Sequence, residues 1–180
     1  NIDFEPLSDK DVLGKALLSM RDNLKTSELE LQASTDDLHK KDELVQAVAS
    51  ATHELISNND HEEAIGEAIR LLGLKLQVDI VNIYQNSGDL LLDGCTSQLM
   101  RWNRVNNSIE YRPPQFQNLT GATNAFEKLS VNEIFHGYTC QLEDVLLKAM
   151  YERNNVKSVA AIPIQVLDEF WGFVSFNDCH

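Results

Sequence analysis

Histidine and cysteine are the side chains of this sequence that could bind a metal ion or act as a nucleophile. They are His39, His53, His61, His136 and His180, with Cys95, Cys140 and Cys179. Metal ligands on one helical face need a spacing of i and i+4, and no two of these histidines have it. The cysteines are odd in number and lack a Cys-x-x-Cys pair, which argues against a disulfide framework and fits a reducing compartment. We therefore expect no metal site.

The patterns that catalysis requires are also missing. The sequence holds no Gly-rich phosphate loop, no nucleophile elbow and no paired catalytic carboxylates. We expect no catalytic residue and no enzymatic activity in this chain. We expect no cofactor either, although a haem bound through a lone histidine such as His136 stays an alternative.

The segment Thr52-His53-Glu54-Leu55 resembles the phospho-accepting helix of histidine kinases. In that family, His-Glu-Leu is followed by a basic residue, a polar residue and Pro, whereas Ser57, Asn58 and Asn59 follow here. No nucleotide-binding box accompanies the motif. We interpret His53 as a solvent-facing histidine and not as a phosphate acceptor.

One long helix is predicted over residues 13–55, where no Pro occurs and apolar residues recur at heptad spacing. Such a repeat keeps one stripe facing a partner helix, which is the condition for a coiled coil. We expect the chain to form a parallel homodimer through this seam. The seam residues are Leu17, Met20, Leu24, Leu31, Leu38, Val45 and Val48.

The middle of the seam is polar. Ser27, Ser34 and Lys41 occupy positions that should face the partner helix. Polar residues at such positions lower coiled-coil stability. The sequence therefore favours a seam that holds loosely at its centre, as a switch would.

A globular part follows the helix. An amphipathic helix is predicted to end near Gly73, followed by two strands, an irregular segment over residues 98–120, a strand, a helix and two final strands. Long irregular segments in compact domains are usually functional loops or lids. The pattern predicts an α+β fold, an antiparallel sheet with helices packed on it.

The closing strands carry a specific family resemblance. The runs 156–164, ending Ala161-Ile162-Pro163-Ile164, and 170–180, containing Trp171-Gly172-Phe173, closely resemble the last hairpin of GAF domains of bacterial sensor proteins. The resemblance covers residues 45–180, although the terminal helix of the family is not in the sequence. It implies a small-molecule pocket between the sheet and the covering loops. The aromatic residues that we expect nearest to it are Trp102, Phe116, Phe126 and Tyr138.

Some GAF domains attach a bilin to a cysteine, usually one followed directly by His. Cys140 is followed by Gln141 and lies too far upstream of Val156 for that pattern. Cys179 is followed by His180, but it lies in the closing hairpin, whereas the chromophore cysteine of the family sits before the penultimate helix. We interpret the cysteines as small apolar residues, which is their common role. A chromophore- or haem-binding sensor stays an alternative function.

The N-terminal segment 1–24 resembles the second helix of a HAMP linker, because Asp11-x-x-Gly14 precedes the heptads. The two resemblances together imply a regulatory GAF module in the cytoplasmic portion of a membrane-anchored receptor. Its output domain would be a histidine kinase in the same chain, and a diguanylate or adenylate cyclase is the alternative.

Charge excludes one class of partner. The sequence has 28 acidic and 15 basic residues, a formal net charge of −13. Nucleic-acid binding requires a basic face, so we expect no nucleic-acid partner.

Overall fold

The computed structural model describes residues 12–87, 95–115, 117–118 and 123–180 of the chain. The chain forms two compact units, Asn1–Val45 and Gln46–His180. Asp11 of the HAMP-like motif lies outside the described residues, so the HAMP assignment stays a prediction. None of the helices in the described ranges is long and apolar enough to cross a membrane.

Helix α1 runs from Val12 to Ser57, and its 46 residues give it a length of about 69 Å. The predicted helix over residues 13–55 is therefore confirmed. Threonine hydroxyls along α1 bond back to the helix itself, as Thr26 does to the carbonyl of Asp22 at 3.0 Å. On its surface, Lys41 pairs with Asp37 one turn earlier at 2.7 Å.

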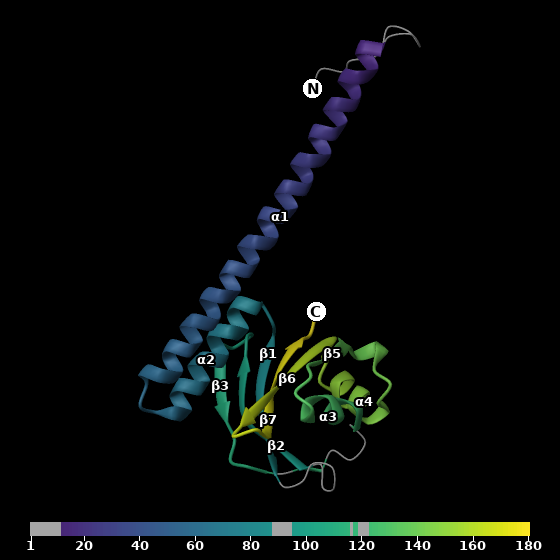
Figure 1. Cartoon of the computed structure of the whole chain (residues 1–180). Coiled ribbons are helices and arrows are strands. Elements are labelled where there is room, and N and C mark those ends of the chain that lie inside the picture. Colours follow the sequence, from purple (N-terminus) through teal and green to yellow (C-terminus); the bar gives the residue numbers. More distant parts are fainter. Residues whose placement is uncertain (1–11, 88–94, 116, 119–122) are drawn as a thin grey trace. The chain divides into compact units, whose positions relative to one another are not determined.

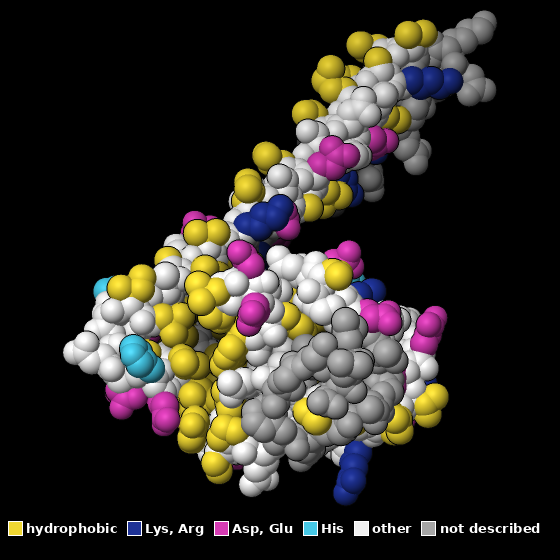
Figure 2. Space-filling model, turned by 60° about the horizontal axis from the view of Figure 1, so that its bottom comes forward, with side chains coloured by type: hydrophobic (Ala, Val, Ile, Leu, Met, Phe, Trp, Pro, Cys, Tyr) yellow, Lys and Arg dark blue, Asp and Glu magenta, His cyan; other side chains and the backbone are white. Residues whose placement is uncertain are grey.

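The seam of α1 faces solvent in the single chain. The exposed fraction of its seven residues ranges from 48% at Leu17 to 69% at Leu31. Figure 2 shows apolar side chains strung along this helix. Ala47 and Ala51, one turn apart near the end of α1, are by contrast buried within the second unit.

Helix α2 runs from His61 to Leu76. Asp60 caps its start by accepting hydrogen bonds from the backbone N–H groups of Glu62 and Glu63. The prediction that this helix ends near Gly73 is wrong, since the left-handed cap is Gln77. Gly73 lies inside the helix, and any side chain there would collide with the indole ring of Trp102, which accounts for glycine at this position.

The sheet is antiparallel throughout the described pairings, in the order β3-β2-β1-β7-β6-β5, with β4 paired to β2. Its strands are β1 (Ile80–Ser87), β2 (Cys95–Asn103), β3 (Ser108–Tyr111), β4 (Gln117–Asn118), β5 (Phe135–Tyr138), β6 (Ser158–Val166) and β7 (Glu169–Asp178). The last two strands, which carry the predicted closing hairpin, meet at the centre of the sheet. The expected α+β architecture is confirmed.

The predicted irregular segment 98–120 is partly sheet in its described residues, so the prediction that it is irregular throughout is wrong. It contains most of β2, all of β3 and the short β4. Residues 112–115 are irregular, and a covering role for them stays a prediction. Leu99 forms a bulge in β2, because Ile83 pairs with Met100 and Tyr84 with Gln98. The extra residue breaks the period of two by which a strand is identified from sequence.

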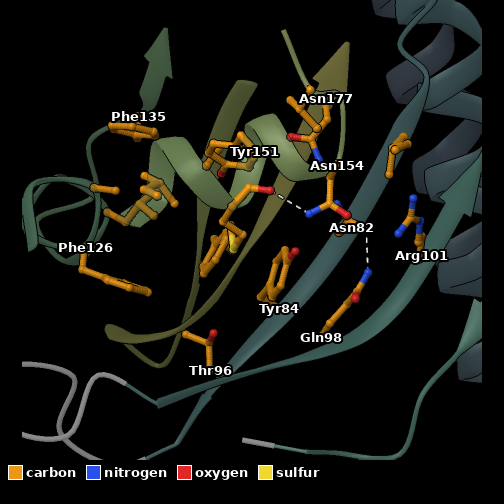
Figure 3. Close-up of a pocket in the computed structure, with 18 of the residues that line it drawn as sticks. Asn82, Tyr84, Thr96, Gln98, Arg101, Phe126, Phe135, Tyr151, Asn154 and Asn177 are labelled. Carbon is orange, nitrogen blue, oxygen red and sulfur yellow. Dashed lines mark hydrogen bonds between the residues drawn. The ribbon is translucent and has the colours of Figure 1, made fainter. Parts of the chain in front are cut away.

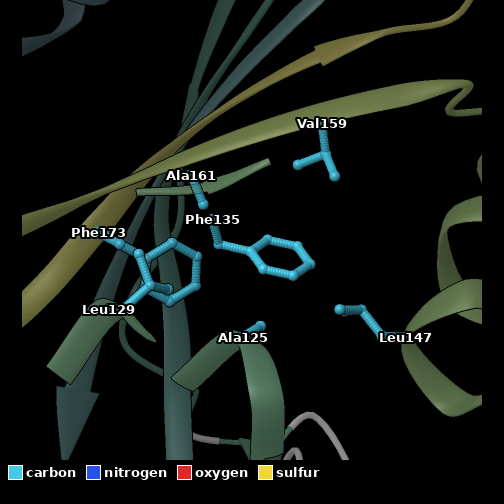
Figure 4. Close-up of a cluster of buried hydrophobic side chains, with 7 residues drawn as sticks. All are labelled: Ala125, Leu129, Phe135, Leu147, Val159, Ala161 and Phe173. Atoms are coloured by element: carbon cyan, nitrogen blue, oxygen red, sulfur yellow. The ribbon is translucent and has the colours of Figure 1, made fainter. Parts of the chain in front are cut away.

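The two faces of the sheet carry separate cores, with α2 on one face and the helices α3 (Thr123–Ser130) and α4 (Val145–Arg153) on the other (Figure 1). Ile69, Val81 and Trp102 belong to the core under α2. The other core joins Leu129 of α3 and Leu147 of α4 to the sheet (Figure 4). The short 3-10 turn η1 (Thr139–Gln141) connects β5 to α4.

Candidate functional site

A cavity of about 440 Å³ lies on the face of the sheet that α3 and α4 cover. Pockets for small molecules usually have volumes of 300–1,000 Å³. Strands β1, β2 and β7 contribute alternate residues to the wall, because side chains on a strand point to opposite faces in turn. The cavity is therefore large enough for a small organic molecule.

One end of the cavity is apolar and aromatic. Phe173 of β7 stacks on Tyr84 of β1 with ring centroids 4.7 Å apart, and Phe126 of α3 meets Phe173 edge-on at 6.0 Å. The stack follows from the sheet register, which pairs Tyr84 with Phe173 directly across the β1–β7 ladder. Leu129 and Leu147 close this end from the helices.

Two tyrosines place their phenol groups in the cavity wall. Burial raises the pKa of Tyr84 and, more strongly, the pKa of Tyr151. Both phenols are therefore neutral at physiological pH. Neither hydroxyl has a hydrogen-bond partner among the residues that the structure describes, so each can donate to a ligand.

A chain of hydrogen bonds forms the polar wall. The Gln98 amide donates to Asn82 Oδ1 at 2.7 Å, and the Asn82 amide donates to Ser175 Oγ at 3.1 Å. Asn82 and Ser175 face each other because the β1–β7 register pairs them. In Figure 3, Gln98 and Asn82 lie on the opposite side of the cavity from Phe126.

Asn177 continues this wall and has an unused acceptor. Its side chain is 4% exposed, and its Oδ1 atom has no hydrogen-bond donor. Its amide nitrogen lies 3.5 Å from Ser175 Oγ. A buried polar atom without a partner costs about 1–3 kcal/mol, so its presence in a cavity wall indicates a site for a donor.

Two arginines from the outer strands complete the polar end. Arg112 is held by Gln98 Oε1 at 3.2 Å and by Glu110 Oε2 at 2.9 Å. Arg101 also lines the cavity, and no hydrogen bond or ion pair joins its guanidinium to the described residues. The cavity thus has a cationic end and an aromatic end.

The structure brings one of the four predicted pocket aromatics to this cavity. Phe126 lines it, and Phe116 lies outside the described residues. Trp102 is fully buried on the other face of the sheet, where its ring packs against Gly73 of α2. Tyr138 is 61% exposed on the edge strand β5 and does not line the cavity. The prediction is wrong for these last two residues, and a ligand contact by Phe126 stays a prediction.

The cavity residues Asn82, Gln98, Arg101, Arg112 and Asn177 were not predicted from the sequence. A usable signal does exist in β1 and β7, where isolated polar residues interrupt apolar runs on the face of each strand that lines the cavity. Asn82 in β1 and the pair Ser175 and Asn177 in β7 fit this pattern. A polar stripe on one face of a central strand indicates a lined cavity or a buried network.

The described residues that line the cavity include no cysteine and no cluster of metal ligands. Cys95 and Cys179 are partly buried, Cys140 is exposed, and none is among the described residues that line the wall. The described residues contain no cluster of three or more potential metal ligands. The geometry therefore offers non-covalent binding through arginine, amide and phenol groups.

Known proteins share this fold. No model of a protein family matches the sequence. A phycocyanobilin-bound GAF domain from a cyanobacterial phytochrome superposes with a TM-score of 0.61 and 16% identity, over 76% of this chain and 80% of that one. The nlh2 GAF domain of A. aeolicus, in an inactive state, gives a TM-score of 0.57 and 15% identity, over 77% and 81%. The described fold is that of a GAF domain.

A relative of known class extends this comparison to sequence. The methanogenesis regulatory histidine kinase FilI of Methanothrix harundinacea (strain 6Ac) is 28% identical over 150 residues, which is 80% of this chain. The chain spans 16% of the length of that relative. The sequence is thus similar to one part of a much longer histidine kinase.

Proposed function

We propose that this chain is a sensory module of a histidine kinase, in which a GAF domain binds a small molecule and α1 pairs with its copy in a parallel dimer. The observation that carries the proposal is the presence, in one chain, of a ligand-sized cavity and a solvent-exposed heptad seam. The similarity to FilI supports a kinase as the output domain. No observation in the described structure favours a cyclase.

The proposed mechanism is a shift between two states. A ligand that binds one conformation of the domain more tightly shifts the population toward it, and paired α1 helices pass the change along the seam. The polar centre of the seam lowers the cost of changing helix rotation or register. By this proposal the chain belongs to the cytoplasmic portion of a membrane-anchored receptor, and it catalyses no reaction of its own.

Dimerisation tests the relay part of the proposal. We expect the 180-residue chain to sediment as a dimer, and Leu31→Gln to raise its dissociation constant at least ~10-fold, because a buried Leu contributes about 1.5–3 kcal/mol. Leu29→Gln is the matched control. This leucine is similarly exposed on the same helix but lies off the seam. Equal effects of the two substitutions, or a monomeric wild type, would contradict the proposal.

A further inference from the structure

The charge of the cavity opposes the charge of the chain. The molecule carries 28 acidic and 15 basic residues, yet the charged side chains that line the cavity are Arg101 and Arg112. No carboxylate is among the described lining residues. Arg112 is exposed and already paired with Glu110, so the argument rests on Arg101, which is partly buried. A positive charge partly removed from water is stabilised by a negative partner, which indicates a site for an anion.

The two arginines differ in availability. Arg112 already bonds Glu110 and Gln98, which fixes its position. Arg101 is partly buried and lies across the β2–β3 ladder from Glu110, but no hydrogen bond or ion pair joins its guanidinium to the described residues, so its N–H groups can donate to a ligand. A guanidinium in this state matches a carboxylate, which it can bind through two parallel N–H···O bonds.

Asn177 adds a second requirement on the ligand. Its Oδ1 atom is a buried acceptor without a donor, on the same side of the cavity as Arg101 in Figure 3. A hydroxyl or amino group beside the carboxylate of the ligand would satisfy it. The neighbouring amides do not, since Asn82 donates to Ser175 Oγ, Gln98 donates to Asn82 Oδ1, and neither reaches Asn177 Oδ1.

The aromatic end sets the third requirement. Figure 3 places Phe126 and Phe135 on the side of the cavity away from Arg101. Tyr84 and Phe173 form a stacked pair at the same wall. Such a surface accepts an aromatic ring or a branched aliphatic group, with edge-to-face or offset contacts worth about 0.5–1.5 kcal/mol for a ring.

We propose that the cavity binds a small organic carboxylate that has a hydroxyl or amino group next to the carboxylate and an aromatic or branched apolar body. Arg101 binds the carboxylate, Asn177 accepts from the neighbouring donor, and the apolar body lies against Tyr84, Phe126 and Phe173. This inference rests on the proposed function, in that the cavity is a ligand site. It adds the chemical class of the ligand.

The test uses three probe molecules that share a phenyl ring on a two-carbon chain. 3-Phenyllactate has the carboxylate and the hydroxyl, 3-phenylpropionate lacks the hydroxyl, and 2-phenylethanol lacks the carboxylate. Calorimetric titration of the 180-residue chain at millimolar probe concentration should give the order phenyllactate, phenylpropionate, phenylethanol from tightest to weakest. Either group, when lost, should weaken binding by about 10-fold or more, the usual effect of removing a bond to a buried or charged partner.

Variants assign the contacts. Arg101→Gln should weaken both carboxylates by ~10–100-fold and leave phenylethanol unchanged. Arg104→Gln is the matched control, because Arg104 is exposed and bonds the carbonyl of Gln77 outside the cavity. Asn177→Leu should make phenyllactate and phenylpropionate bind equally. If Asn177→Leu fails to fold, Asn177→Ser, which is smaller and polar, takes its place.

The outcomes separate the two proposals. Tighter binding of phenylethanol or of the cation phenethylamine than of the carboxylates would overturn the ligand class and leave the cavity as a ligand site. Carboxylate binding that Arg101→Gln does not weaken would also overturn it. Failure of all the probes, charged and neutral, to bind at millimolar concentration would overturn both the class and the cavity as a sensory site.

Discussion

Gly73 and Trp102 show how one missing side chain places another. The indole of Trp102 fills the space above Gly73, and its N–H donates to Asn107 Oδ1 at 3.2 Å. The ring is fully buried, so it has no room to move away. Glycine inside a helix costs about 1 kcal/mol relative to alanine, and the fit of Trp102 accounts for its presence here.

Gly73→Ala should therefore destabilise the domain. The added methyl group overpacks the core, which typically costs about 1–3 kcal/mol. Gly66→Ala is the matched control, since it makes the same change in the same helix, and its new Cβ would lie 3.2 Å from the partly exposed side chain of Ile109, which can move. Urea denaturation should give a lower free energy of unfolding for Gly73→Ala than for Gly66→Ala, and equal values would refute this role of Gly73.

The buried tyrosines predict a loss of stability at high pH. Burial raises the pKa of Tyr84 and Tyr151 in the folded state, whereas an unfolded tyrosine titrates near pH 10. Their contribution is therefore complete below about pH 10 and is lost as the pH rises toward the folded pKa, by up to about 1.4 kcal/mol per pH unit for each group.

The double variant Tyr84→Phe, Tyr151→Phe should lose less stability than the wild type between about pH 9 and 11. Tyr138→Phe, at a position 61% exposed, serves as the control and should follow the wild type. Chemical denaturation at several pH values measures the difference. Parallel pH profiles for the double variant and the wild type would show that these phenols do not titrate differently on folding.

At the residue scale, the sequence identified candidate aromatic residues but not the face of the sheet on which each side chain lies. Phe126 lines the cavity, whereas Trp102 is buried on the opposite face. A single residue decides this outcome, because the bulge at Leu99 changes which positions of β2 share a face. Bulges depend on pairing with a neighbouring strand, and a local pattern does not contain that information.

Among the elements, α1 was the most predictable, because a heptad repeat without Pro needs no tertiary context. The closing β6–β7 hairpin was identified almost as well. Most of β2 and all of β3 fell in the segment predicted to be irregular. The cavity face of β2 carries Thr96, Gln98 and Arg101, so the expected alternation of apolar residues is absent there, and β3 is only four residues long. Cavity-lining strands thus resemble loops when they are read from sequence.

The polar centre of the α1 seam gives a prediction at the scale of the element. Ser27, Ser34 and Lys41 are exposed in the single chain and would face the partner helix in the proposed dimer. Replacing all three with Leu should strengthen the dimer by at least ~10-fold, because buried leucine stabilises the seam. In the full-length kinase that we propose, the same change should hold the output in one state and abolish its response to the signal.

Three leucines off the seam provide the comparison. Ser19, Thr26 and Lys40 are also exposed on α1. Each lies one residue before a position of the heptad series, so replacing it with Leu adds the same apolar surface elsewhere on the helix. Sedimentation equilibrium measures the dimer and autophosphorylation measures the output. A kinase that still responds normally with Leu at positions 27, 34 and 41 would rule out the loose seam as a switch.

For the molecule as a whole, the net charge and the arginines of the cavity have opposite effects on an anionic ligand. A net charge of −13 repels anions at long range, and the arginines attract them only near the cavity. Raised ionic strength screens the repulsion between exposed charges more than it screens the partly buried Arg101. Affinity for a carboxylate should consequently be less sensitive to salt than it is at a basic surface site.

The sheet also joins the cores on its two faces. Arg101 and Trp102 are consecutive residues of β2, one in the cavity wall and the other in the core under α2. We expect a ligand bound to Arg101 to shift the backbone that positions the indole. The emission of Trp102, which is fully buried, should then change when the cavity is occupied. The protein contains its own optical probe, and replacing Trp171, the other of its two tryptophans, would isolate that signal.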